Sequence, residues 1–218
     1  MTTEEIQTLE IVHGKNPRNS IIWLHGLGAT NDDFISIIDE LKLPDEISIR
    51  FIFPQAPLRS VSLNGGYLMP AWYDIFSLDR NSEEDESGIC ASEKILHGLI
   101  EKEVERGISS DHIFLAGFSQ GGAMALHTGI RYPKKLAGII ALSTYLPLRA
   151  HITKMTYKLP ILMAHGKQDT VVTLAIAELS KKLLVENGYS VAWHDYNMEH
   201  SVCLEEIEDI RSWLLAHC

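Results

Sequence analysis

The five residues Gly117-Phe118-Ser119-Gln120-Gly121 place the strongest constraint on what this chain can fold into. An apolar run precedes them, and apolar residues at helical spacing follow. Glycines two positions before and two after a serine are typical of the nucleophile elbow, a tight strand-to-helix turn that exposes a strained serine. A Gly-rich turn without chemistry has the same spacing. The flanking strand and helix patterns favour Ser119 as a catalytic nucleophile.

Apolar runs and helical patterns alternate along the whole chain. Strands are expected over residues 8–13, 20–24, 48–53, 113–116, 136–142, 159–165 and 189–196. Helices are expected from Thr30 or Asn31 to Leu41, over 87–106, after the elbow, and over 171–187 and 203–216. This alternation predicts the α/β class, with a mostly parallel central sheet and helices on both faces. With 218 residues, the chain is expected to form a single domain, 1–218.

Residues 54–74 interrupt this alternation with a long segment that is rich in Pro, Gly and aromatic side chains. Connections of this length in a compact domain are usually functional or disordered, and the apolar content argues against disorder. We expect an ordered excursion that covers or lines the site, with a small satellite core as the alternative. An exposed apolar flap can seat a substrate or a second copy of the chain, so a homodimer stays open.

Composition limits the partners and the compartment. The chain has 19 Lys+Arg and 29 Asp+Glu, so its net charge of −10 argues against nucleic-acid binding. Three scattered cysteines indicate free thiols in a reducing compartment. No signal peptide and no apolar stretch of membrane-spanning length are recognisable, so a cytoplasmic protein without stable membrane insertion is expected.

A serine nucleophile needs a base, and the base needs an orienting carboxylate. Asp169 follows one predicted strand and His200 follows the last one, each directly before a helix and in the order serine, acid, histidine. Taken alone, Asp169 could cap a helix and His200 could be a surface histidine. His25 and His165 each precede a glycine at a strand end, where structural hydrogen bonds are the more common role.

The loop His25-Gly26-Leu27-Gly28 fits the second half of an oxyanion hole. In the α/β-hydrolase fold one donor is the backbone N–H after the nucleophile, here Gln120, and the other follows an early strand, here Leu27. The loop lacks the phosphate-binding patterns GxGxxG and GK[ST], and the chain has no HExxH or clustered metal-ligand spacing. No metal and no cofactor are expected.

Several motifs together resemble the carboxylesterase/acyl-protein thioesterase (phospholipase/carboxylesterase) family of the α/β-hydrolase superfamily. They are His25-Gly-Leu-Gly28, Phe53-Pro-Gln-Ala-Pro57, Asn64 with Met69-Pro-Ala-Trp-Tyr-Asp74, Gly117-Phe-Ser-Gln-Gly-Gly122, Leu142-Ser143, and the segments around Asp169 and His200. The resemblance extends from about residue 20 to the C-terminus. Residues 29–31 and 144–145 depart from the usual family pattern, which leaves the preferred acyl chain length open.

The resemblance implies a compact α/β-hydrolase without a large cap domain and with no cofactor. It implies ester or thioester hydrolysis by Ser119, His200 and Asp169, with Leu27 and Gln120 as oxyanion donors. It also implies a flap around residues 63–72 beside an apolar acyl groove, whose candidate residues are Leu27, Leu68, Met69, Trp72 and Val172. The substrate would be a small ester or an acyl chain, carried by a lipid or an acylated protein.

Three functions are compatible with these residues. The first is a carboxylesterase that acts on short or medium acyl esters through an acyl-enzyme. The second is an acyl-protein thioesterase or lysophospholipase that accepts a long chain. The third is a ligand-binding hydrolase fold without catalysis, which the complete set of Ser119, Asp169 and His200 disfavours. We favour the first.

Overall fold

The computed structural model describes residues 6–77, 83–152, 157 and 159–218. Its main sheet has seven strands in the order β1-β3-β2-β6-β7-β8-β9. Strand β1 pairs antiparallel with β3, and all the other neighbours pair in parallel. The strands are β1 (Thr8–His13), β2 (Asn19–Leu24), β3 (Ile49–Pro54), β6 (Ile113–Phe118), β7 (Gly138–Leu142), β8 (Pro160–Gly166) and β9 (Ser190–Tyr196).

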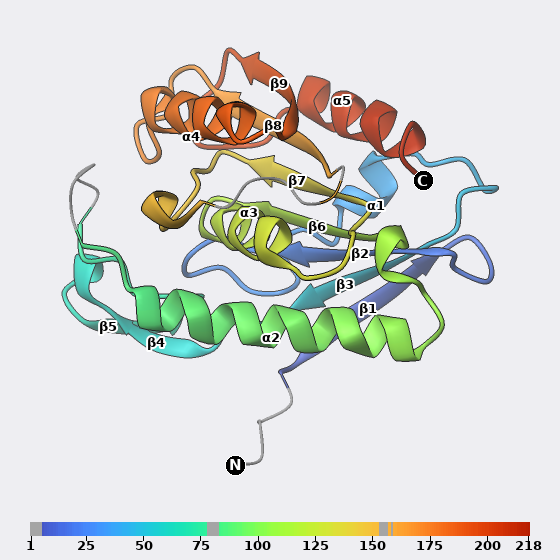
Figure 1. Ribbon diagram of the computed structural model, residues 1–218, viewed down its shortest axis with the longest axis horizontal. Coiled ribbons are helices and arrows are strands. Elements are labelled where there is room, and N and C mark those ends of the chain that lie inside the picture. The colour runs from blue at the N-terminus through green and yellow to red at the C-terminus, as the bar shows by residue number, and fades with distance from the viewer. Residues whose placement is uncertain (1–5, 78–82, 153–156, 158) are drawn as a thin grey trace.

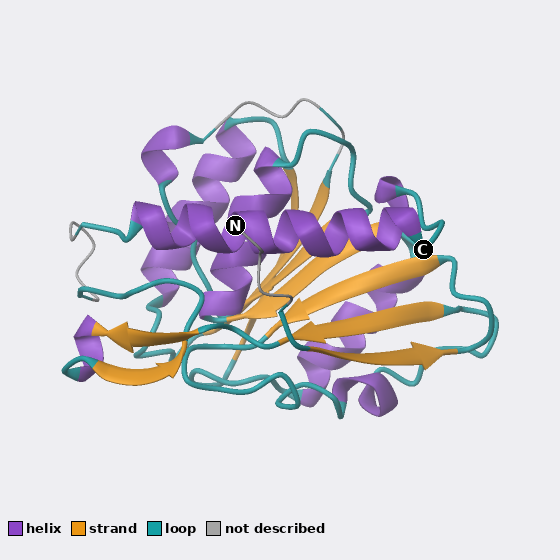
Figure 2. Cartoon of the chain, turned by 90° about the horizontal axis from the view of Figure 1, so that it is seen from below, coloured by secondary structure: helices purple, strands orange, loops and turns teal. Residues whose placement is uncertain are grey.

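Helices cover both faces of this sheet, as Figures 1 and 2 show. Within β2, Ile22 and Leu24 belong to the core layer under α2, α3 and α4, whereas Ile21 and Trp23 belong to the layer under α1 and α5. This alternation follows from the period of two along a strand that is buried on both faces. The expected α/β class with a mostly parallel sheet is therefore confirmed. The helices are α1 (Ile37–Glu40), α2 (Glu86–Glu105), α3 (Gln120–Arg131), α4 (Leu174–Glu186) and α5 (Leu204–Leu215).

The first expected helix is much shorter than the pattern suggested. Helix α1 spans only Ile37–Glu40 and is preceded by Ser36, so the expected cap at Thr30 or Asn31 is wrong. The Thr30 hydroxyl donates to the side chain of Asp32 instead, a local bond that competes with helix formation. The apolar residues of this stretch still face the sheet, which is why their spacing resembled that of a longer helix.

The 54–74 excursion contains a two-stranded antiparallel hairpin that the sequence patterns did not reveal. Strand β4 (Leu58–Val61) is followed by the short 3-10 turn η1 (Ser62–Asn64) and by β5 (Tyr67–Pro70). Gly65 and Gly66 turn the chain between them with φ of 67° and 81°, angles that glycine tolerates best. The hairpin lies beside the N-terminal end of α2 (Figure 1).

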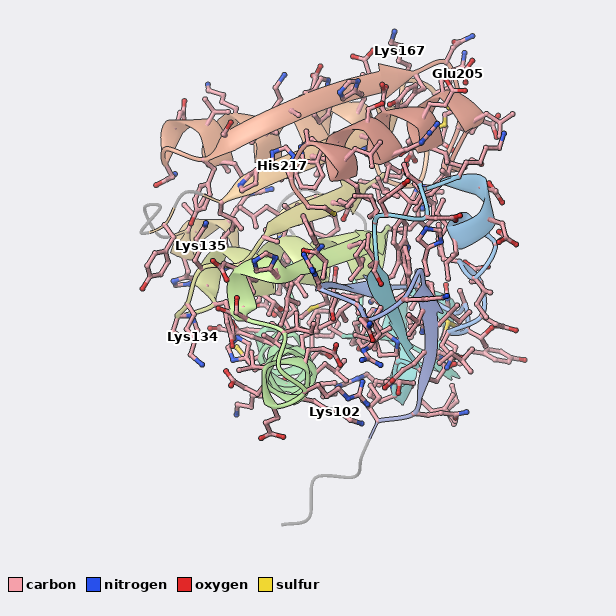
Figure 3. All side chains as sticks on the ribbon, turned by 90° about the vertical axis from the view of Figure 1, so that its right-hand side faces the viewer. Lys102, Lys134, Lys135, Lys167, Glu205 and His217 are labelled. Atoms are coloured by element: carbon pink, nitrogen blue, oxygen red, sulfur yellow. The ribbon has the colours of Figure 1, made fainter. Side chains whose placement is uncertain are left out.

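Several charged side chains mark the outer surface of the molecule. Figure 3 shows Lys134, Lys167 and Glu205 at its periphery, and all three are exposed. Lys134 forms an ion pair with Glu101 at 3.2 Å. Exposed pairs of this kind contribute little to stability. Among the residues that the structure describes, no helix is both long and apolar enough to cross a bilayer.

Candidate active site

Ser119 occupies the turn between β6 and α3 in a strained conformation, with φ of 54° and ψ of −121°. Such a conformation costs on the order of 1–3 kcal/mol for a residue other than glycine. The neighbouring glycines are required by close backbone contacts. A Cβ on Gly117 would lie 2.4 Å from the carbonyl carbon of Gly121, and one on Gly121 would lie 2.3 Å from the oxygen of Leu24. The predicted strand–turn–helix geometry around Ser119 is therefore present.

Three side chains from three separate loops meet at this turn. The Nε2 atom of His200 lies 3.0 Å from Oγ of Ser119, and its Nδ1 atom lies 2.7 Å from Oδ2 of Asp169. Because a carboxylate only accepts hydrogen bonds, Nδ1 carries the proton and donates it to Asp169. Nε2 is then free to accept the hydroxyl hydrogen of Ser119. The three residues that the sequence patterns selected form a continuous hydrogen-bonded line.

Asp169 also fixes the loop before α4. Its Oδ1 atom accepts the backbone N–H groups of Val171 and Val172, at 2.9 and 2.8 Å. Helix α4 begins only at Leu174, so Asp169 holds a turn rather than capping the helix. The alternative of a helix cap is therefore wrong, and Asp169 holds the turn through one oxygen and faces His200 through the other.

The two other histidines at strand ends make structural hydrogen bonds. His165 is buried, and its Nε2 lies 2.8 Å from the carbonyl oxygen of Val172. His25 is also buried, and its Nε2 accepts the N–H of Ala56 at 3.0 Å while Nδ1 lies 2.8 Å from the carbonyl oxygen of Gly26. Burial lowers the pKa of both imidazoles. Both therefore serve as neutral anchors of the loops that surround Ser119.

The loop after β2 packs directly against the elbow. A Cβ on Gly26 would lie 3.5 Å from Cβ of Ser119, and Gly28 donates its N–H to the carbonyl of Pro70 at 2.9 Å. The backbone N–H groups of Leu27 and Gln120 form no hydrogen bond within the described part of the chain. Two unpaired N–H groups close to a serine in sequence or in the fold are suited to stabilise a negative oxygen.

A cavity of about 860 Å³ opens beside Ser119 and His200. Leu27 and Phe118 line it near the serine, and Val172 lines it on the α4 side. Its size is within the range of sites that bury a small molecule, and its walls are mainly apolar. Further apolar side chains come from distant parts of the chain, namely Leu63, Ile75, Phe76, Leu148, Val171 and Ile176.

Three of the five expected groove residues do not line this cavity. Leu68 is 65% exposed on β5, and its neighbour Met69 instead receives a hydrogen bond from Asn64 at its sulfur, at 3.3 Å. Trp72 is fully buried, and its indole N–H donates to the carbonyl of His25 at 3.0 Å. An aromatic residue in a loop looks the same in a sequence whether it faces a groove or the core. Leu27 and Val172 are the two that line the cavity.

The sequence patterns missed a pair of tyrosines in the cavity wall. The hydroxyl groups of Tyr73 and Tyr145 lie 2.9 Å apart, and both residues line the cavity. Burial raises the pKa of Tyr145 to about 12 and that of Tyr73 well above its usual value, so both stay protonated at neutral pH. In the sequence, the departure from the family pattern at residues 144–145 was the feature that could have indicated this part of the cavity wall. Residues 29–31, the other departure, do not line the cavity.

Thr144 supports the elbow directly. Its hydroxyl donates to the carbonyl oxygen of Ser119 at 2.7 Å, and its methyl group packs where a Cβ on Gly122 would lie 2.8 Å away. This contact could not be predicted from sequence spacing, because β7 lies beside β6 only in the folded sheet.

The chain is similar to known proteins over most of its length. Residues 6–218 match the phospholipase/carboxylesterase family. The chain is 41% identical to acyl-protein thioesterase 1 of Neurospora crassa, over 89% of this chain and 85% of the relative. It is 35% identical to a probable carboxylesterase of Oryza sativa subsp. japonica, over 92% of this chain and 78% of the relative.

A solved structure is similar over nearly the whole chain. The crystal structure of Zea mays acyl-protein thioesterase 2 superposes with a TM-score of 0.85 at 29% identity, covering 97% of this chain and 99% of the other. Within the described residues, no large cap domain interrupts the shared fold. The chain therefore belongs to the phospholipase/carboxylesterase family of serine hydrolases and has the α/β-hydrolase fold.

Proposed function

We propose that this chain hydrolyses carboxylic esters of short to medium acyl chains through an acyl-enzyme on Ser119. The observation that carries the proposal is the hydrogen-bonded line from Ser119 through His200 to Asp169, at 3.0 and 2.7 Å, at the wall of an apolar cavity. The base, its orienting acid and the acyl-sized space are thereby adjacent to one nucleophile.

In the first step, Ser119 Oγ attacks the acyl carbonyl carbon while its proton passes to Nε2 of His200. The carbonyl oxygen becomes negative and accepts the N–H groups of Leu27 and Gln120. Collapse of this intermediate breaks the bond to the leaving alcohol or thiol, which takes the proton from His200. Water then repeats the sequence on the acyl-enzyme and releases the carboxylic acid. Asp169 keeps His200 in the tautomer that both steps need.

The relatives favour a second candidate, a thioesterase that removes acyl groups from proteins. The Neurospora crassa relative and the Zea mays structure are both described as acyl-protein thioesterases. A thiolate leaves more readily than an alkoxide, so the same residues can process both bonds. The two candidates differ in the acyl length and in the leaving group that the cavity and its rim accept.

Hydrolysis of p-nitrophenyl esters from acetate to laurate tests the proposal, with wild type and Ser119→Ala compared at matched circular dichroism. We expect activity in the wild type that is lost in the variant, with an optimum at short or medium chains. An S-acyl peptide and its O-acyl analogue then separate thioesterase from esterase. A folded wild type that is inactive on every substrate would instead favour a ligand-binding protein without catalysis.

A further inference from the structure

Trp72 connects the two loops that carry the candidate oxyanion donors. Its indole Nε1–H donates to the carbonyl of His25, two residues before Leu27, at 3.0 Å. Its backbone N–H donates to the side-chain oxygen Oε1 of Gln120 at 2.9 Å. Its own carbonyl accepts the hydroxyl of Ser92 from α2. Trp72 has no exposed surface, so every one of these bonds is shielded from water.

The side chain of Gln120 is bound at both ends. Its Nε2 atom donates to the carbonyl of Tyr73 at 2.8 Å, next to the bond that Oε1 receives from Trp72. The opposite amide orientation would bring two donors together at Trp72 and two acceptors together at Tyr73, so one orientation is fixed. Gln120 is 3% exposed. A buried amide that is satisfied at both ends holds its backbone rigidly, because breaking either bond leaves an unpaired polar group.

We propose that Trp72 and the Gln120 side chain are positioning residues that set the separation between the Leu27 and Gln120 N–H groups. This inference rests on the proposed function, since it concerns the oxyanion hole of the same site. The Leu27 N–H comes from the loop after β2, and the Gln120 N–H comes from the first residue of α3. Sheet pairing between β2 and β6 extends only to Leu24 and Gly117, so the bonds through Trp72 add a tie beyond the ends of the two strands. An oxyanion hole stabilises charge through donors that are already in place, so small displacements lower the rate.

Two substitutions remove the ties without removing the donors. Gln120→Met keeps the chain length and the backbone N–H but loses the bonds to Trp72 and Tyr73. Trp72→Phe loses the indole bond to His25. Trp23→Phe is the matched control, because Trp23 is a buried tryptophan of β2 whose indole nitrogen has no hydrogen-bond partner in the described part of the chain.

The measurements are kcat and KM on the best p-nitrophenyl ester, and the affinity for a trifluoromethyl ketone of the same acyl length. Ser119 Oγ adds to the ketone carbon and passes its proton to His200, which leaves a tetrahedral oxyanion in the hole. We expect kcat to fall about 10- to 100-fold in each variant with KM changed less than about three-fold, because complete loss of one donor costs about 10²–10³. Ketone affinity is expected to fall by a similar factor.

A purely structural role would lower the melting temperature without this parallel loss in ketone affinity. The double variant is expected to lose little more kcat than the worse single variant, because both substitutions disrupt the same set of hydrogen bonds between the two donor segments. The inference is overturned if folded Gln120→Met keeps wild-type kcat and ketone affinity, and this variant decides the question if Trp72→Phe does not fold. It is also overturned if Trp23→Phe loses as much kcat as Trp72→Phe. Absence of hydrolysis in the wild type would overturn the proposed function itself.

Discussion

The Nδ1 atom of His200 lies 2.7 Å from Oδ2 of Asp169, a carboxylate whose side chain has no exposed surface. In this position the carboxylate selects the imidazole tautomer with the proton on Nδ1, and in the proposed mechanism it stabilises the imidazolium that forms during acyl transfer. The second oxygen of the same carboxylate holds two backbone N–H groups of the next turn. One buried side chain therefore both orients His200 and holds the loop before α4.

Asp169→Asn tests this relationship. The asparagine oxygen can still accept the N–H groups of Val171 and Val172, so the fold should be kept. Its NH₂ group faces Nδ1 of His200, favours the wrong tautomer, and is expected to lower kcat by about 10³–10⁴-fold. Steady-state kinetics on the best ester, with circular dichroism as the control, measures the effect. Retention of more than about a tenth of wild-type kcat would contradict the assigned role.

The second prediction concerns pH and His25. Burial lowers its pKa from 6.5, and its Nε2 accepts the N–H of Ala56 at 3.0 Å. The unfolded chain binds a proton near pH 6.5 and the folded chain only at lower pH. The free energy of unfolding should therefore be unaffected by His25 above pH 6.5 and should decrease as pH falls below that value. His165 acts in the same direction.

Urea unfolding between pH 5 and pH 7.5 tests the trend, and the NMR titration of the His25 imidazole identifies its source. The imidazole signal can be assigned by its absence in His25→Gln. A measured pKa at or above 6.5 for His25 would refute the account, whatever the stability curve shows.

The elbow, and the placement of Asp169 and His200 beside it, could be predicted from the sequence for a physical reason. A Cβ on Gly117 would lie 2.4 Å from the carbonyl carbon of Gly121, so only glycine fits there, and this requirement leaves a fixed glycine spacing around Ser119 in the sequence. Asp169 and His200 follow strands, and the carboxyl ends of parallel strands meet at one edge. Local geometry and topology together were enough to bring these three side chains into one site.

The cavity wall could not be predicted in the same way. Tyr73 and Tyr145 are 72 positions apart and meet only through tertiary packing. Trp72 has the aromatic character expected of a groove residue, yet it is in the core, because apolar patterns report burial and not the surface against which a side chain is buried. The β4–β5 hairpin could not be predicted from the residue pattern, because its strands have only four residues each.

The third prediction concerns a buried acid away from the proposed chemistry. Glu206 in the first turn of α5 has no exposed surface, and neither carboxylate oxygen has a hydrogen-bond partner among the described residues. Burial raises its pKa from 4.5 to about 8, with Asp209 adding to the rise and the nearby backbone N–H of Cys203, which is not placed for a hydrogen bond, partly offsetting it. The folded chain therefore keeps this proton over a pH range in which the unfolded chain releases it.

Glu206 changes the free energy of unfolding with pH in the direction opposite to His25. The contribution of Glu206 to stability is complete below pH 4.5 and is lost as pH rises towards 8. Glu206→Gln removes this titration, so the variant should gain stability relative to wild type by about 4 kcal/mol between pH 4.5 and pH 8. Denaturant unfolding at the two pH values measures the gain. An equal difference between variant and wild type at both values would show that Glu206 is ionised in the folded chain.

Val172 and Leu68, two of the expected groove residues, differ in whether they line the cavity. Val172 is 8% exposed and lines the cavity, whereas Leu68 is 65% exposed and does not. Val172→Phe adds a ring to a wall whose backbone stays fixed by Asp169, so the room for an acyl chain should shrink while the carbonyl end near Ser119 is unchanged. We expect kcat/KM for laurate to fall about ten-fold relative to acetate, since one or two displaced methylene contacts are worth about 1–3 kcal/mol.

Leu68→Ala is the control. It should leave the ratio of kcat/KM for laurate to that for acetate within about two-fold of wild type, because the Leu68 side chain does not line the cavity. If Leu68→Ala changes the chain-length preference and Val172→Phe does not, the acyl chain binds along the hairpin and not in the cavity beside α4.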